Sequence, residues 1–211
     1  MKKLLLFIIL IAFGITLNAQ ITYVNINATG ANNGTSWADA YTDLHSATFN
    51  VTSGEIWVAA GTYAPSKSFT GNIPASNKQK TFKIQGNVQV YGGFNGSETM
   101  LAQRNWNTNV TTLTGIVGGG LYAFNIVRFD GNTNATVLDG FTISDAQAYG
   151  TGSVERYGGA IHLTTNASPT IRNCKFLTNS ANQTGGAIYA LTGSVQIFNC
   201  EFKNNLTSVF D

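Results

Sequence analysis

Charged side chains are scarce in this sequence, because Asp, Glu, Lys and Arg together account for only 10% of its 211 residues. Twelve side chains are basic and ten are acidic, and two of the basic ones, Lys2 and Lys3, lie at the N-terminus. The rest of the chain is therefore close to neutral. A neutral chain does not attract nucleic acid or anionic lipid by its charge, and we expect no nucleic-acid partner.

Residue types that bind metals or act in catalysis are also few, with two His and two Cys in the whole sequence. No zinc-ligand spacing, Ser-His-Asp pattern or GxGxxG motif occurs, and we interpret residues 118–120 as a glycine turn. His45 falls on a predicted helix and His162 takes the place that Tyr189 holds in a later repeat, so both are interpreted as surface or packing residues. The sequence predicts no metal, no cofactor and no defined catalytic residue.

Long apolar runs are absent except at the N-terminus, where one extends from Leu4 to Ile15 between Lys3 and Ala19. A basic start, an apolar run and a small residue are typical of a cleaved secretory signal. A membrane anchor is the alternative, but the run is shorter than the roughly 20 residues that span a bilayer. We expect residues 1–19 to be a signal peptide and the mature chain to be secreted or at the cell surface, without a membrane span.

Glycine is plentiful, with 23 residues, and Asn and Thr are abundant, which is a composition of strands and turns. Residues 35–48 (TSWADAYTDLHSAT) alone have a clear helical pattern. Ser36 and Asp39 form a capping box, and apolar residues recur at helical spacing after it. We expect one short N-terminal capping helix on an otherwise all-β domain that covers residues 20–211.

Two segments near the C-terminus are copies of each other, residues 158–180 (GGAIHLTTNASPTIRNCKFLTNS) and residues 185–205 (GGAIYALTGSVQIFNCEFKNN). Six-residue units inside and before them are separated by 25, 33 and 26 residues. A strand-rich unit at such a period is typical of a solenoid, and we predict a parallel β-helix. The units begin at Leu113, as a partial copy, and at Leu138, Ile171 and Ile197.

The repeated positions have a physical explanation in such a fold. We expect the first, fourth and sixth positions to point inward and to stack on their counterparts about 4.8 Å away. The third position holds only Gly or Asn, which tolerate left-handed backbone angles, so we expect a bend there. The predicted bend residues are Gly115, Gly140, Asn173 and Asn199, and the other predicted ladder residues include Cys174, Cys200, Phe176 and Phe202.

Outward positions in the same units carry opposite charges, Asp139 above Arg172 and Lys175 above Glu201. We interpret these as surface pairs that favour register, each contributing little stability. The two cysteines fall in equivalent columns. A disulfide is an alternative in an exported protein, but stacked side chains lie side by side, and we expect two free thiols.

The GGAI and FxxN motifs, as in Gly158 to Ile161 with Phe176 to Asn179, resemble the polymorphic outer membrane protein repeat. The N-terminal half, with EIWVAAGTY and VYGGFNGSE, resembles secreted right-handed β-helix proteins of the pectin-lyase-like fold. These resemblances imply a right-handed parallel β-helix, secreted or on the surface of a Gram-negative bacterium, with an adhesin-like or structural role. Such proteins usually continue through further repeats to a C-terminal domain, so the resemblance also implies a truncated chain.

The longest interval between repeats contains extra residues from Asp145 to Gly159, which we expect to form a protruding loop. Its aromatic and charged residues suit contacts to a carbohydrate or to a host or cell-surface protein. A surface loop without function is the alternative, since insertions are tolerated cheaply. The candidate binding residues are Tyr149, Glu155, Arg156 and Tyr157.

The pectin-lyase-like fold also includes polysaccharide lyases and glycoside hydrolases, so a polysaccharide-degrading enzyme is the second hypothesis. Hydrolysis needs two carboxylates at one groove, and lyase chemistry needs a base with a cation or metal that neutralises a uronate. The acids Asp130, Asp139 and Asp145 have no telling spacing. Function must be argued from a site rather than from a fold, and we expect a binding or structural module.

Overall fold

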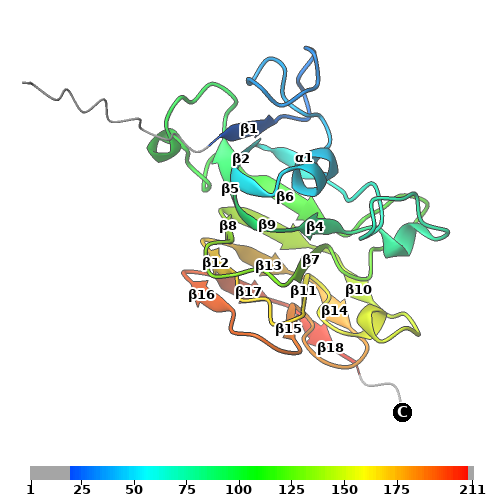
Figure 1. The fold of residues 1–211 in the computed structure, drawn as a ribbon. Coiled ribbons are helices and arrows are strands. Elements are labelled where there is room, and N and C mark those ends of the chain that lie inside the picture. Colours follow the sequence, from blue (N-terminus) through cyan, green and yellow to red (C-terminus); the bar gives the residue numbers. More distant parts are fainter. Residues whose placement is uncertain (1–19, 209–211) are drawn as a thin grey trace, which may run out of the picture.

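The computed structural model describes residues 20–208 and consists of parallel β-sheets with one α-helix (Figure 1). The predicted signal peptide lies outside the described residues. Within residues 20–208, none of the helices has the length and apolar character that a membrane crossing requires.

Four sheets contain all the strands, and every pairing between named strands is parallel. Sheet 1 contains β1 (Ile21–Val24), β2 (Ser53–Ala59), β5 (Asn87–Phe94), β8 (Val137–Asp139), β12 (Thr170–Arg172) and β16 (Gln196–Phe198). Sheet 2 contains β3 (Gly61–Tyr63), β6 (Thr111–Thr114), β9 (Phe141–Ser144), β13 (Lys175–Leu177) and β17 (Glu201–Lys203). Sheet 3 contains β10 (Gln147–Ala148), β14 (Ser180–Ala181) and β18 (Leu206–Thr207), and sheet 4 contains β4 (Phe82–Ile84), β7 (Val127–Asp130), β11 (Ile161–Thr164) and β15 (Ile188–Ala190). The helices are α1 (Leu44–Asn50) and the short 3₁₀ turns η1 (Asn77–Gln79), η2 (Leu101–Gln103) and η3 (Val154–Arg156).

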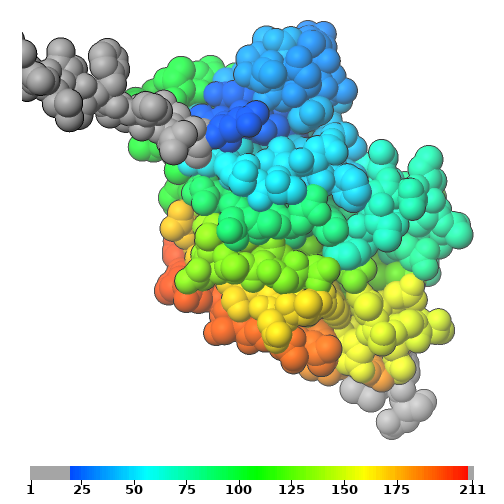
Figure 2. Space-filling view, in the orientation of Figure 1, coloured from blue at the N-terminus to red at the C-terminus, as the bar shows by residue number. Residues whose placement is uncertain are grey.

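The chain visits the sheets in a fixed order, from β8 in sheet 1 through β9, β10 and β11 in sheets 2, 3 and 4, and back to sheet 1 at β12. We call the segment between two visits to sheet 1 a circuit. Successive circuits form successive layers from the blue end to the red end in Figure 2. The predicted alignment of the last three units is confirmed, because Leu138, Ile171 and Ile197 are register partners in sheet 1.

The partial unit at Leu113 was predicted in the wrong register. Leu113 lies in β6 of sheet 2 and pairs with Ile143, whereas the partner of Leu138 in the preceding circuit is Val90. Leu113 was aligned with Leu138 because both begin the short pattern Leu-x-Gly, which is too short to fix the register. Gly115 accordingly does not have a left-handed backbone. Counted from Val90, the third position is Gly92, and its neighbour Gly93 is left-handed with φ 94°.

The predicted bend is confirmed at the other three positions. Gly140, Asn173 and Asn199 have φ angles of 84°, 53° and 48°, in the left-handed region that Gly and Asn tolerate. Each bend separates a strand of sheet 1 from the following strand of sheet 2. Side chains on both sides of the bend can therefore point into one core.

The glycine pair and the final asparagine of the repeat motif also have structural roles. A Cβ on Gly159 would lie 2.5 Å from the carbonyl oxygens of Ser180 and Gly186, so only glycine allows this approach of neighbouring circuits. Asn179 is fully buried; its Nδ2 donates to the carbonyl of Ile143 (2.9 Å) and its Oδ1 accepts from the backbone N–H of Ala146 (3.2 Å). The repeated asparagine thus provides hydrogen-bond partners for backbone groups of the turn that are buried in the core.

The core is a continuous apolar column between the sheets, built from stacked side chains of successive circuits. Phe176 and Phe202 show the stacking directly, with ring centroids 4.7 Å apart and planes 9° from parallel. Cys174 is buried and Cys200 half-buried, and both are free thiols, as predicted. Burial raises the pKa of Cys174, while a hydrogen bond with Cys174 lowers the pKa of Cys200 to about 7.

The helix is shorter than predicted and begins later. It starts after Asp43, whose side chain caps the N–H of His45 at 3.0 Å, and it packs against β1 and β4. Asp39 does bond Ser36, as the capping box requires, but it also accepts from Ala31 N–H (2.8 Å) and so closes a turn instead of a helix. His45 is 1% exposed and is a packing residue.

Candidate functional site

A cavity of about 530 Å³ lies beside sheet 4, between two loops. Loop A (residues 64–81) connects β3 to β4, and loop B (residues 149–160) connects β10 to β11. Both loops project from the same side of the layered body in Figure 2. The lining residues are Ser68, Phe69, Thr70, Asn72, Pro74, Lys78, Gln79, Lys80 and Thr81 of loop A, Phe124, Asn125 and Arg128 at β7, and Gly152, Ser153, Val154 and Glu155 of loop B.

Loop B is shorter than the protruding loop predicted over residues 145–159. Gln147 and Ala148 form β10, which pairs with β14, and Ala146 and Ala148 are buried. The free part of the loop therefore begins at Tyr149. Its end is anchored by the Nδ2 of Asn125, which donates to the carbonyls of Tyr157 (2.7 Å) and Gly158 (2.8 Å).

A column of cationic and aromatic side chains runs along the outer face of sheet 4, one from each strand. Lys83 of β4, Arg128 of β7, His162 of β11 and Tyr189 of β15 are register partners. Phe69 of loop A covers one end of this column, with its ring centroid 4.1 Å from Arg128 Cζ and 4.7 Å from Lys83 Nζ. These are cation–π distances, so Phe69 fixes both cations against the sheet.

Arg128 is half-buried and lacks a counter-ion at contact distance. Within residues 20–208 both ion pairs involve Asp139, and the buried Nε of Arg128 has no hydrogen-bond partner. Loss of solvent lowers the pKa of Arg128, while the more distant Asp130 acts in the opposite direction. The guanidinium remains charged at neutral pH, because an Arg pKa lies far above 7.

His162, next to Arg128 in the column, is only 3% exposed. Burial and the nearby Arg128 charge lower its pKa to about 4. Its buried Nδ1 has no hydrogen-bond partner, and its ring lies 5.3 Å from that of Tyr189. His162 is therefore a neutral packing residue at pH 7.

The four predicted binding residues lie on loop B in different environments. Glu155 lines the cavity; its Oε1 accepts from Gln79 Nε2 (3.1 Å) and its Oε2 from Gly152 N–H (3.2 Å). Tyr149 is 42% exposed. Tyr157 stacks on Tyr189, with centroids 4.6 Å apart. Arg156 has a buried Nε without a hydrogen-bond partner. The structure thus brings only Glu155 of the four to the cavity wall.

Sequence reasoning missed the loop A residues and Arg128 as lining residues. Loop A lies about 80 positions before loop B, and no repeat links the two. One signal was present for Arg128, which alternates with Val127 and Phe129, both buried. That alternation indicates an outward side chain on a strand.

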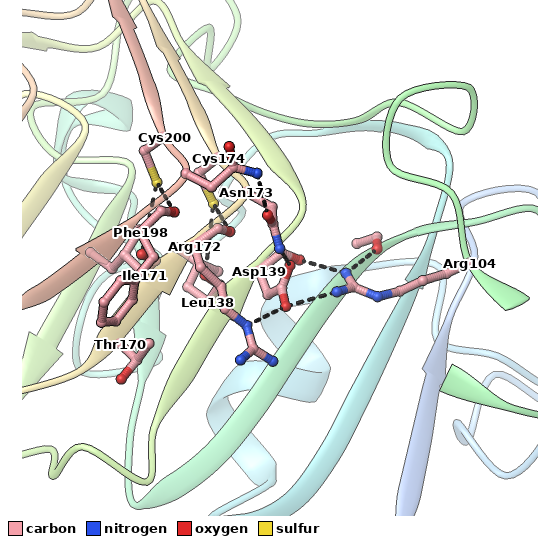
Figure 3. A network of polar contacts seen from close by, with 12 residues as sticks. Arg104, Leu138, Asp139, Thr170, Ile171, Arg172, Asn173, Cys174, Phe198 and Cys200 are labelled. Carbon is pink, nitrogen blue, oxygen red and sulfur yellow. Dashed lines mark hydrogen bonds and ion pairs between the residues drawn. The ribbon is translucent and has the colours of Figure 1, made fainter. Parts of the chain in front are cut away.

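A second polar cluster surrounds Asp139, which was predicted to be a surface residue and is fully buried instead (Figure 3). Its Oδ2 lies 2.7 Å from Arg104 Nη2 and 2.6 Å from Arg172 Nε. Its Oδ1 accepts from Asn173 Nδ2 at 2.8 Å. The predicted partner Arg172 is correct, but the loop that carries Arg104 covers the carboxylate. The cluster is structural, since both oxygens of Asp139 are occupied.

The other predicted surface pair is in register, with Lys175 opposite Glu201 and both exposed. They form no ion pair within the described part of the chain. This agrees with the small contribution that solvated ion pairs make to stability.

Comparison with protein-family models, with curated proteins and with solved structures finds no match to this chain. Its function has to be inferred from the geometry of the site itself.

Proposed function

We propose that the chain is an exported, right-handed parallel β-helix module with an adhesin-like role, which binds carbohydrate in the cavity between loops A and B. The parallel register of strands from successive circuits supports the β-helix. Crossover connections between parallel strands are right-handed in about 98% of cases, which supports the hand. The repeat motifs support export to the cell surface, as their resemblance implies.

The wall of the cavity is the observation that carries the binding function. It combines the aromatic faces of Phe69 and Phe124 with the amides of Asn72, Gln79 and Asn125. Sugars present apolar C–H faces and hydroxyl edges, so an aromatic face beside amide groups is suited to them. The volume of about 530 Å³ lies within the range of small-molecule sites.

The small number of acids at this site favours carbohydrate binding over glycoside hydrolysis. Among the lining residues Glu155 is the one carboxylate, and both of its oxygens already accept hydrogen bonds. Hydrolysis requires two carboxylates facing one groove. The site therefore supports a binding module better than a glycoside hydrolase.

The proposal is tested by measuring the binding of residues 20–211 to an array of neutral and acidic oligosaccharides. We expect Phe69→Ala to weaken binding by about fivefold or more, because an aromatic stacking face is worth roughly 1 kcal/mol or more. Phe198→Ala is the matched control, since Phe198 is exposed on β16 in sheet 1, outside the cavity lining.

Tyr149→Ala, in the same assay, asks whether the predicted aromatic tip of loop B adds to binding. Circular dichroism confirms that each variant is folded. The proposal is wrong if the folded parent binds no sugar, or if Phe69→Ala binds as well as Phe198→Ala.

A further inference from the structure

The cavity between loops A and B carries an excess of positive charge. Its lining includes the cations Lys78, Lys80 and Arg128, and against these three stands one carboxylate, Glu155. Glu155 is held by Gln79 and by its own loop, and it makes no ion pair within the described residues. The chain as a whole is nearly neutral, so this excess is local.

Arg128 is held in place by its strand and by the ring of Phe69. It lies on strand β7, and the ring of Phe69 covers the face of its guanidinium at 4.1 Å. A covered face leaves the edges of the guanidinium, which carry the N–H donors, for a ligand. Those donors match two oxygens of one anion, as in bidentate recognition of carboxylates.

Among residues 20–208, Arg128 has no counter-ion at contact distance, and this sets it apart from Arg104 and Arg172. Both of those arginines are neutralised by Asp139 at 2.7 Å and 2.6 Å. Arg128 has only the more distant Asp130, and its buried Nε donates to no acceptor. Partial loss of solvent around a guanidinium without a counter-ion costs free energy, and an anionic ligand in the cavity would offset part of that cost.

We propose that this cavity selects sugars that carry an anionic substituent, a uronate carboxylate or a sulfate ester, which Arg128 binds. This inference rests on the proposed carbohydrate-binding function and names its ligand class. Phe69 and the amides of the wall bind the sugar ring, and Lys78 and Lys80 add attraction that salt screens. Carboxylate and sulfate share the chemistry of an oxyanion with at least two acceptor oxygens.

The test measures binding of residues 20–211 to immobilised polygalacturonate, to fully methyl-esterified polygalacturonate and to dextran sulfate, which carries sulfate esters and no carboxylate. The esterified polymer has the same backbone without the charge, so it is the matched neutral ligand. We expect about tenfold tighter binding to one or both acidic polymers than to the ester. That preference should shrink as salt rises from about 50 to 500 mM, because screening weakens charge attraction. The two acidic arms distinguish carboxylate from sulfate.

Arg128→Gln should reduce binding to the acidic polymers about tenfold and leave binding to the ester unchanged. Arg156→Gln is the control, because Arg156 lies on loop B but does not line the cavity. If Arg128→Gln fails to fold, the double variant Lys78→Gln, Lys80→Gln on loop A takes its place. It should lower acidic binding severalfold.

Two outcomes separate the two proposals. Equal, Phe69-dependent binding to acid and ester by the folded parent would overturn the charge selection and leave carbohydrate binding in place. Failure of the parent to bind any of the three polymers, or any sugar of the array, would overturn the carbohydrate-binding function itself. Acidic binding that Arg128→Gln and Arg156→Gln reduce equally would also overturn the role of Arg128.

Discussion

The asparagines at the bend between sheets 1 and 2 combine two properties in one side chain. Asn173 tolerates a left-handed backbone, and its Nδ2 donates to Asp139 Oδ1 in the preceding circuit. Its own Oδ1 accepts from Asn199 Nδ2 at 2.7 Å in the next circuit. Glycine offers the first property only, so asparagine also links the circuits.

Substitutions at Asn173 should separate these two contributions to the free energy of unfolding. We expect Asn173→Val to cost about 1–2 kcal/mol for the left-handed backbone and about 1 kcal/mol more for the lost hydrogen bonds. Asn173→Gly should lose only the hydrogen bonds. Urea unfolding measures both.

Asn204 is the matched control for this series, because it is left-handed (φ 56°), exposed and without a side-chain hydrogen bond in the described residues. We expect Asn204→Gly to leave stability unchanged and Asn204→Val to lower it. Equal losses for Gly and Val at Asn173 would show that the backbone angle does not matter there.

The buried carboxylate of Asp139 is expected to be the most sensitive single position. Asp139→Asn leaves Arg104, whose side chain is 7% exposed, without its counter-ion, so we expect a loss of about 3–5 kcal/mol. Arg172→Met should cost much less, because the Arg172 side chain is 41% exposed. Thermal and urea unfolding test this order, and a reversed order would contradict the buried ion pair.

At the scale of elements, the outer face of sheet 4 is unusual because it is covered. Phe69 lies over Arg128, and Tyr157 stacks on Tyr189, so side chains that point outward are still partly removed from water. The neutral His162 between them follows from this cover. The lowered pKa of His162 therefore depends on this face staying covered.

We expect His162 to make the protein less stable in acid. Its pKa is about 4 in the folded chain and about 6.5 when unfolded, so below pH 6.5 the unfolded chain binds a proton that the folded chain does not. Stability from this site is therefore complete above pH 6.5 and declines as the pH falls toward 4.

His162→Phe should reduce the loss of stability over that pH range, and phenylalanine keeps an aromatic ring beside Tyr189. Urea unfolding of both proteins between pH 7 and 4 gives the comparison. His45, whose pKa burial also lowers, contributes with the same sign in parent and variant and cancels. Parallel pH profiles for the two proteins would contradict the assignment to His162.

Elements that repeat in the sequence could be predicted, and elements that do not repeat could not. The strands around Ile171 and Ile197 were aligned correctly because six positions share residue types with the same physical role. Val90 was missed because its strand β5 continues through Gly92 and Gly93 to Phe94, whereas the later units bend at their third position. The helix was overextended, since Asp39 satisfies a capping pattern but uses it in a turn.

The candidate site was harder to predict for the same reason. Loop B stood out because it lengthens a repeat, and Glu155 does line the cavity. Loop A and the Arg104 loop belong to no repeat, and no pattern in the sequence shows that they cover sheet 4 or Asp139. Tertiary contacts over such separations depend on packing, which local patterns do not encode.

At the scale of the molecule, each circuit contacts mainly its neighbours, so stability should add up circuit by circuit. The exposed fraction of a stacked side chain differs between a circuit that has a described neighbour on both sides and the last described circuit, which has one on one side. Phe176 is 0% exposed, whereas its register partner Phe202 is 49% exposed. We expect the last described circuit to open before the others.

Removing one whole circuit should leave a folded protein. Deletion of residues 140–172 spans the 33 positions between the register partners Asp139 and Arg172, so Asn173 takes the place of Gly140 and both tolerate the bend. We expect cooperative urea unfolding with a smaller dependence on urea, because less surface is buried.

Deletion of residues 140–171 is the control. It removes one residue fewer, so Arg172 takes the bend position of Gly140, and the strand that follows is shifted by one position, which turns its side chains to the opposite face. We expect this protein to expose apolar surface, bind a hydrophobic dye and lose cooperativity. Equal behaviour of the two deletions would contradict the register.

The hydrogen bonds between circuits point along the stack, and this gives the chain a mechanical character. A pull along the stack would load these bonds directly and in series, so the weakest circuit would part first while the others stayed closed. Contour length would then be released in steps of one circuit, 26 or 33 residues. Under the adhesin-like role proposed above, such a tether would yield gradually under load instead of breaking at once.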